Sequence, residues 1–75
     1  MEFDYTVDGE PQQTQEHDLT PRQILTNAGL DPAQRYLIEI EGTKQKSLKD
    51  AMDTPLHIHQ SMKFVTASLG GTGVS

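Results

Sequence analysis

The residues that could take part in chemistry lie near the C-terminal end of the sequence. Gly70 and Gly71 stand side by side after Leu69, and residues 72–75 follow them. Because glycine lacks side-chain bulk, a chain ending in this pair could carry its carboxylate into a narrow enzyme channel, where the carboxylate could be activated for attack by a nucleophile. The alternative is that the pair belongs to a flexible tail or a remnant linker.

Histidines are the next candidates. His57 and His59 flank Ile58, and His17 could join them. Alternate residues of an extended segment lie on the same side, which gives this pair the spacing of some metal sites. The alternative is a solvated face opposite Leu56 and Ile58. We favour the solvated face because no acidic or cysteine ligand accompanies the two histidines, and we predict no metal site.

The rest of the composition argues against an enzyme. The absence of cysteine excludes a disulfide framework, a thiolate zinc site and a cysteine nucleophile, and it fits a reducing compartment. No serine lies in a G-x-S-x-G setting, and 75 residues form one small domain with little scaffold for a catalytic triad. We therefore expect a cytoplasmic protein that is not an enzyme and holds no cofactor.

Charge and hydropathy narrow the classes of partner. The formal net charge is -5, and the lysines and arginines are spread from Arg22 to Lys63 without forming a run. We therefore expect no nucleic-acid partner. The N-terminal residues lack the basic and apolar blocks of a signal peptide, and no apolar stretch approaches the roughly 20 residues of a membrane span, so no membrane partner is expected.

The first part of the chain predicts a hairpin and then a helix. Apolar and polar residues alternate from Phe3 to Val7, Asp8-Gly9 suits a turn, and a polar return strand is inferred over residues 12–17. The helix begins with an N-cap, a proline and a capping-box glutamine, has a three-residue apolar face, and ends at a glycine and a proline. These residues are Thr20, Pro21, Gln23, Ile24, Leu25, Ala28, Gly29 and Pro32.

A second strand is predicted from Tyr36 to Glu41. Its alternation places Tyr36, Ile38 and Ile40 on one face, which we expect to be buried, and Leu37 on the other, open face. An apolar residue on an open sheet face has two readings. Leu37 either belongs to a surface that docks a partner protein or is an ordinary exposed leucine.

The remaining segments complete a small α+β fold. Residues 44–48 suit a short edge strand, residues 50–55 a loop, and residues 62–69 a last strand that carries Phe64, Val65 and Ala67. With one short helix available, the sheet must bury its apolar face against that helix. We therefore predict a β-grasp, with a mixed sheet of four to five strands packed on one helix over residues 1–69, and a flexible tail over residues 70–75.

Several segments resemble the ubiquitin superfamily, and more closely the bacterial ubiquitin-like modifiers of the multiubiquitin type. They are Tyr5-Thr6-Val7-Asp8-Gly9-Glu10, Leu19-Thr20-Pro21-Arg22-Gln23-Ile24-Leu25, Ala28-Gly29-Leu30 and Tyr36-Leu37-Ile38-Glu39. The resemblance implies a ubiquitin fold and a protein modifier joined to a target protein by an isopeptide or similar bond. It also implies an activating enzyme that uses ATP and magnesium, a conjugating enzyme and a deconjugating or processing peptidase. The bacterial likeness suggests a role in antiviral defence.

The last strand and the glycine pair are similar to ubiquitin's C-terminal end. Ubiquitin has arginines before its glycines where this chain has Ala67, Ser68 and Leu69, which favours a dedicated activating enzyme. Residues 72–75 follow the glycines, so either a peptidase cleaves between Gly71 and Thr72 or the glycine pair is coincidental. The resemblance therefore assigns conjugation to Leu69, Gly70 and Gly71.

Two other functions fit the same pattern. A sulfur carrier of this fold also ends in two glycines and is adenylated before it receives sulfur as a thiocarboxylate, although such carriers usually end at the glycines. A non-covalent interaction module would dock through Leu37 and its strand, and its tail would be dispensable. The lysines at 44, 46, 49 and 63 either accept further modifiers or are ordinary surface residues.

Overall fold

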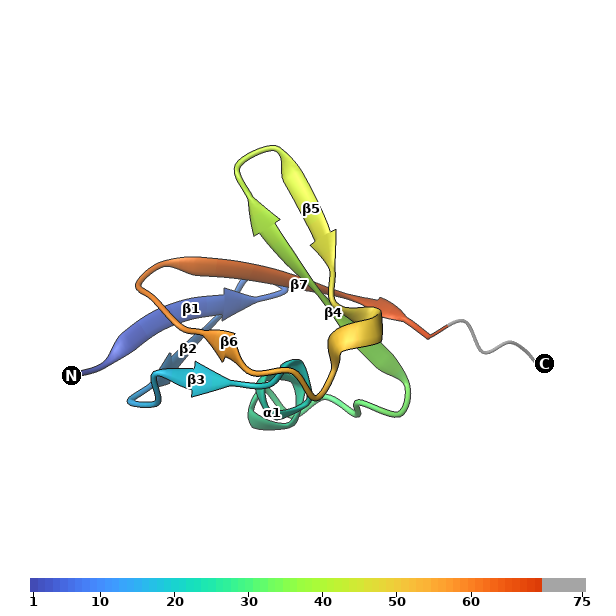
Figure 1. Ribbon diagram of the computed structural model, residues 1–75, viewed down its shortest axis with the longest axis horizontal. Coiled ribbons are helices and arrows are strands. Elements are labelled where there is room, and N and C mark those ends of the chain that lie inside the picture. Colours follow the sequence, from blue (N-terminus) through green and yellow to red (C-terminus); the bar gives the residue numbers. More distant parts are fainter. Residues whose placement is uncertain (70–75) are drawn as a thin grey trace.

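The computed structural model describes residues 1–69 of the chain, and the predicted flexible tail at residues 70–75 lies outside them. The elements follow one another in the order β1 (Phe3–Val7), β2 (Glu10–Thr14), β3 (Asp18–Leu19), α1 (Pro21–Asn27), β4 (Arg35–Glu41), β5 (Lys44–Ser47), the 3-10 helix η1 (Lys49–Ala51), β6 (Leu56–His57) and β7 (Met62–Ser68). Figure 1 shows their arrangement in space.

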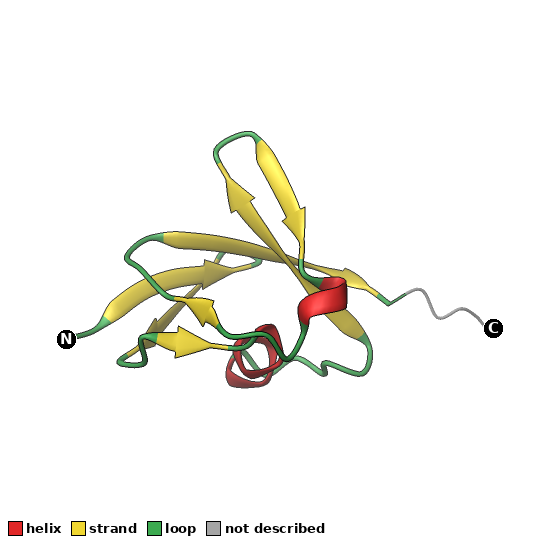
Figure 2. Cartoon of the chain, viewed as in Figure 1, coloured by secondary structure: helices red, strands yellow, loops and turns green. Residues whose placement is uncertain are grey.

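Five strands form one mixed sheet in the order β2-β1-β7-β4-β5. The central pair, β1 and β7, is parallel, and the other pairs are antiparallel. Helix α1 lies on one side of the sheet, and β3 pairs with β6 in a second, two-stranded sheet (Figures 1 and 2). This architecture confirms the predicted α+β class with a mixed sheet packed on one helix.

The hairpin turn has the conformation that its sequence favours. Asp8 and Gly9 both have positive φ, at 53° and 80°. Two consecutive left-handed residues define the turn that matches the natural twist of antiparallel strands, and Asp-Gly tolerates it well. Because the turn spans only these two residues, β2 begins at Glu10, earlier than the predicted return strand over residues 12–17.

Both ends of the helix follow the predicted capping chemistry. The Gln23 N–H donates to Thr20 Oγ1 at 3.1 Å, and the Thr20 N–H donates to Gln23 Oε1 at 2.9 Å. At the other end Gly29 has φ +79°, and the Leu30 N–H donates to the Leu25 carbonyl at 2.9 Å. Left-handed geometry with this bond is the Schellman motif, which satisfies the last carbonyls of a helix.

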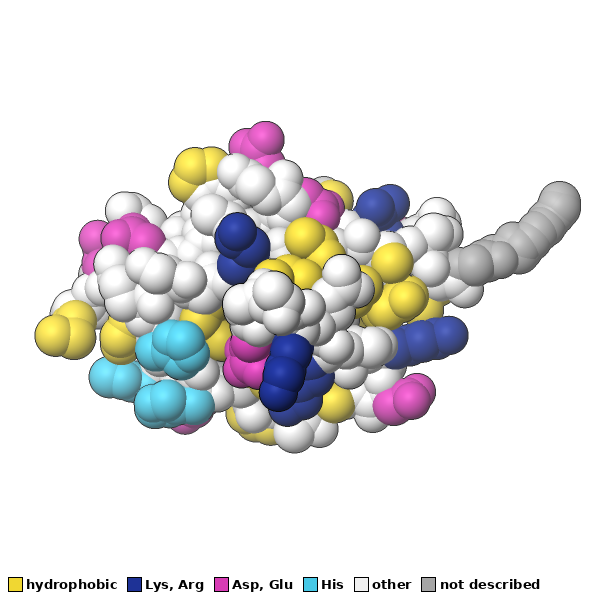
Figure 3. Space-filling model, turned by 90° about the horizontal axis from the view of Figure 1, so that it is seen from above, with side chains coloured by type: hydrophobic (Ala, Val, Ile, Leu, Met, Phe, Trp, Pro, Cys, Tyr) yellow, Lys and Arg dark blue, Asp and Glu magenta, His cyan; other side chains and the backbone are white. Residues whose placement is uncertain are grey.

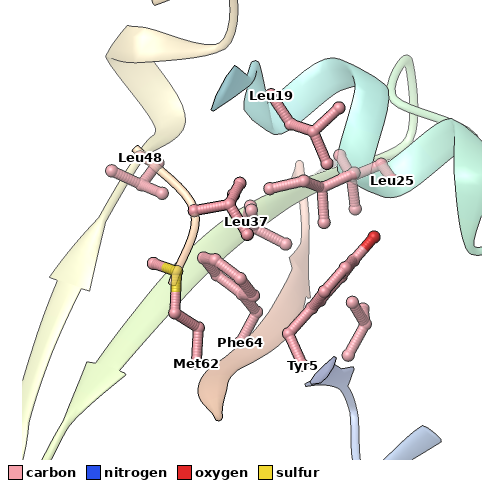
Figure 4. Packing of buried hydrophobic residues seen from close by; sticks show 10 residues of the cluster. Tyr5, Leu19, Leu25, Leu37, Leu48, Met62 and Phe64 are labelled. Carbon is pink, nitrogen blue, oxygen red and sulfur yellow. The ribbon is translucent and has the colours of Figure 1, made fainter. Parts of the chain in front are cut away.

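Phe64 of β7 lies at the centre of the core, where its side chain is fully buried. The ring meets the Tyr5 ring edge-on, with centroids 5.9 Å apart (Figure 4). The other buried apolar residues come from every layer of the fold: Val7, Leu19, Ile24, Leu25, Leu37, Leu48, Ile58 and Met62. The sheet is therefore tied to the helix and to the loop before β7 through one cluster.

The prediction for the two faces of β4 was wrong. Leu37 is 0% exposed and belongs to the core, whereas Tyr36, Ile38 and Ile40 are only partly buried. The register between β4 and β7 explains the reversal, because Glu39 pairs with Phe64 and so places Leu37 on the helix-covered face. Alternation distinguishes two faces of a strand, but it does not show which one a helix will cover.

Candidate functional site

The predicted conjugation segment begins where the described structure ends. Leu69 is 36% exposed and follows the last residue of β7. Its N–H donates to the Gln34 carbonyl at 2.9 Å, next to the pairing of Arg35 with Ser68. Gly70, Gly71 and Thr72 lie outside the described residues. The chain is thus held against the start of β4 up to Leu69, at the end of the molecule opposite the N-terminus (Figure 1).

A polar cluster lies beside β7 at Thr66, three residues before Leu69. The Asp8 carboxylate accepts the Thr66 N–H at 2.8 Å through Oδ1 and the Thr66 hydroxyl at 2.6 Å through Oδ2. The same hydroxyl oxygen accepts a hydrogen bond from Arg35 Nε at 2.9 Å. We call Asp8, Thr66 and Arg35 the clasp. It joins the β1–β2 turn, β7 and β4 at one point.

The clasp prolongs the parallel ladder beyond the end of β1. The last backbone bond of this ladder runs from the Asp8 N–H to the Phe64 carbonyl at 3.0 Å. Asp8 then turns into left-handed geometry, and its side-chain Oδ1 accepts the next N–H of β7, that of Thr66. A carboxylate that accepts two hydrogen bonds makes stronger contacts than a neutral carbonyl. The sequence indicated Asp8 only as a turn residue, and nothing in it pointed to a partner so distant along the chain.

The sheet face opposite the helix carries an apolar patch. It consists of partly exposed residues on β4 and β7: Tyr36, Ile38, Ile40, Val65 and Ala67. Cross-strand pairing joins Tyr36 to Ala67 and Ile38 to Val65. We call these five residues the open-face patch. Leu37, the predicted docking residue, is not part of it because its side chain lies on the other side of β4.

A hollow of about 590 Å³ adjoins the patch on the same face. Thr6 and Lys63 line it and pair with each other, and Lys63 also pairs with Ile40 of the patch. Pro11 and Gln13 of β2 also lie in its wall. On the open face, the apolar patch of β4 and β7 thus borders the hollow over β1 and β2 at Lys63.

The four lysines predicted as either acceptors or surface residues are all exposed. Lys44 and Lys46 lie on β5, an edge strand as predicted. Lys63 lies on the open face, and Lys49 Nζ lies 5.7 Å from the centroid of the Tyr36 ring. Lysines on an edge strand also hinder pairing with other sheets, so their exposure does not distinguish the two readings.

The histidines gather at one end of the molecule (Figure 3). His57 Nδ1 lies 3.6 Å from Asp18 Oδ1, and the His17 ring meets the Phe3 ring edge-on at 5.4 Å. His59 is exposed, while Ile58 between the two histidines is buried. Within residues 1–69 no group of three histidine and acidic side chains is placed to hold a metal ion. The arrangement matches the solvated face opposite Ile58.

Glu39 is a charged residue that lies almost fully buried beside the core. Its side chain faces the covered side of β4 and is only 7% exposed. Burial, followed by the neighbouring Glu41 carboxylate, raises the pKa of Glu39, while Lys46 and His59 act in the opposite direction. The folded state therefore binds the Glu39 proton more tightly than the unfolded state does.

Glu39→Gln is expected to stabilise the domain at pH 7. With a raised pKa in the folded state, stability falls as pH rises from the ordinary carboxyl range through the raised value, and the amide removes this loss. The gain should stay below about 1 kcal/mol and should vanish near pH 4. Thermal unfolding at both pH values measures it. Glu10→Gln, at an exposed position that plays no part in the Glu39 shift, serves as control, and an equal gain for Glu39→Gln at pH 4 would contradict the assignment.

Comparisons of the chain with protein-family models, curated proteins and solved structures find no match. Among the described helices, none has the length and apolar character needed to cross a membrane. The geometry described above defines the candidate site, which consists of β7 with Leu69, the clasp and the open-face patch.

Proposed function

We propose that the chain is a ubiquitin-like protein modifier with a β-grasp fold, which acts as a substrate of other enzymes in the cytoplasm. One observation carries the proposal: the central strand β7 is held in place up to Leu69, and the next two residues are Gly70 and Gly71. The mixed five-stranded sheet on one helix supports it. The resemblance of the sequence to bacterial modifiers supports it as well.

The proposed chemistry uses only the carboxylate of Gly71. A peptidase hydrolyses the Gly71–Thr72 bond, and the released carboxylate attacks the α-phosphate of ATP with loss of pyrophosphate. A thiolate of the activating enzyme then displaces AMP to form a thioester, and an amine or hydroxyl of the target displaces the thiol. The nucleotide, the magnesium ion and the thiol belong to the partner enzymes. The modifier supplies a terminus without side-chain bulk.

We propose the open-face patch, in place of Leu37, as the surface that docks these enzymes. It is apolar and partly exposed, and it lies on β7, which leads to the tail, and on β4, which pairs with β7. Exposed apolar surface of this kind is typical of protein-interaction sites. Docking there would hold the domain while the tail enters the active site.

Intact-mass measurement tests the proposal. The chain is incubated with the peptidase encoded by a neighbouring gene, and the product that ends at Gly71 is then incubated with ATP and the neighbouring activating enzyme, as wild type and as Gly71→Ala. We expect the loss of residues 72–75 and an enzyme thioester that the variant fails to form. An unchanged mass with enzymes of proven activity would sink the modifier proposal. A product with sulfur in place of a carboxylate oxygen would instead identify a sulfur carrier.

The open-face patch also favours a second function, that of a non-covalent interaction module. In that case a protein without residues 70–75 would bind its partner as tightly as the full chain, while Ile38→Lys would abolish binding. Under the modifier proposal the truncated protein would still dock through the patch but would form no thioester, because the Gly71 carboxylate would be missing.

A further inference from the structure

We infer that the clasp positions the tail for carboxyl activation, with Asp8 as a positioning residue. The inference rests on the proposed function. Its basis is the double hydrogen bond from Thr66 to the Asp8 carboxylate, together with the bond from Arg35 to the same threonine hydroxyl. These bonds hold β7 from the β1 side at the last point where β1 can reach it.

Covalent geometry shows why this point matters. Gly71 is two residues beyond Leu69, so its reach from a fixed Leu69 is at most about 7 Å. If the strand frayed back to Thr66, five residues would be free and the reach would grow to about 17 Å. An enzyme that binds the domain and the tail together needs the carboxylate at a fixed distance from the docked surface. A longer free segment lowers the effective concentration of the carboxylate in the active site.

Beyond Phe64, the clasp supplies hydrogen bonds to β7 from the β1 side, at Thr66. Without the clasp, the antiparallel pairing with β4 remains, ending with Arg35 opposite Ser68 and the Leu69 bond to Gln34. Strand ends that are held on one side open at a small fraction of the global unfolding free energy. The core residues of β7, Met62 and Phe64, lie before the clasp and stay packed. Loss of the clasp should therefore loosen the end of β7 without unfolding the domain.

Asp8→Gly is the informative variant, because glycine keeps the left-handed turn without strain and removes the carboxylate. We expect the Thr66 and Leu69 amides to exchange with solvent about tenfold faster, with the Phe64 amide unchanged. We also expect kcat for thioester formation to fall about tenfold. KM should stay near the wild-type value, because the docking surface is untouched. Thr66→Val, which removes only the hydroxyl, should give a smaller change in the same direction.

Asp53→Gly is the matched control. Asp53 makes an exposed ion pair with Arg22 at 2.8 Å on the helix side, so this variant also loses an aspartate and some stability. It should leave both the exchange rates and kcat at the wild-type values. A purely structural role for Asp8 would lower stability in Asp8→Gly and leave kcat unchanged, which would overturn the inference.

Thioester formation by the wild type alone shows whether the proposed function fails, separately from the inference about the clasp. If wild-type protein forms no thioester with an activating enzyme whose activity has been shown independently, the modifier function fails and the inference fails with it. If the wild type reacts and Asp8→Gly reacts with the same kcat while its Thr66 amide exchanges faster, only the inference fails. If the Thr66 amide is not affected, the clasp does not hold the strand end and the inference also fails.

Discussion

Phe64→Ala is expected to unfold the domain or bring it close to unfolding. Truncating a fully buried phenylalanine costs about 3–5 kcal/mol, from lost transfer free energy and the cavity that remains. A domain of this length has a total stability of only about 4–11 kcal/mol. Phe64 also supports the Tyr5 ring, so the loss extends beyond its own side chain. Urea denaturation followed by far-UV circular dichroism measures the change.

Phe64→Leu provides the graded control. Leucine fills most of the volume, so the loss should be about 1–2 kcal/mol and the domain should remain folded. If the free energy of unfolding of Phe64→Ala lay within about 1 kcal/mol of the wild-type value, the core would not depend on this ring. The domain would then have to bury its apolar surface in some other arrangement.

Leu37→Thr is expected to be far more harmful than Ile38→Thr, although the two residues are neighbours in β4. Threonine at position 37 loses apolar contacts and places a hydroxyl in the core, at a cost of about 2–4 kcal/mol. At position 38 it keeps a β-branched side chain on a partly exposed face, and the cost should be within about 1 kcal/mol. Chemical denaturation of the two variants side by side measures the difference.

The pair also tests the assignment of faces in β4. Equal losses, or a larger loss at Ile38, would mean that the helix covers the other face. If the assignment holds, Ile38→Thr is the variant for binding studies, because it alters the open-face patch without disturbing the core. A binding defect in Leu37→Thr would report only the loss of folded protein.

Much of the local structure was predictable because short-range chemistry determines it. Thr20, Pro21 and Gln23 specify the start of the helix, and Gly29 specifies its end, through bonds made within a few residues. The Asp8-Gly9 turn is equally local. The short ladder of β3 and β6 was not predicted, since two-residue strands have no period to detect. Residues 70–75, which carry the proposed chemistry, were identified by composition and resemblance.

The sequence by itself determined the helix and the five strands of the main sheet, their order and hence the class of fold, because an amphipathic helix and several alternating strands bury their apolar faces against one another in an α+β arrangement. Only the tertiary structure decided that Leu37 lies in the core, that Ile38 lies on the open face and that the Asp8 carboxylate bonds to Thr66. These features depend on the register between strands far apart in the chain. A one-residue shift of that register exchanges the two faces while leaving every local pattern unchanged.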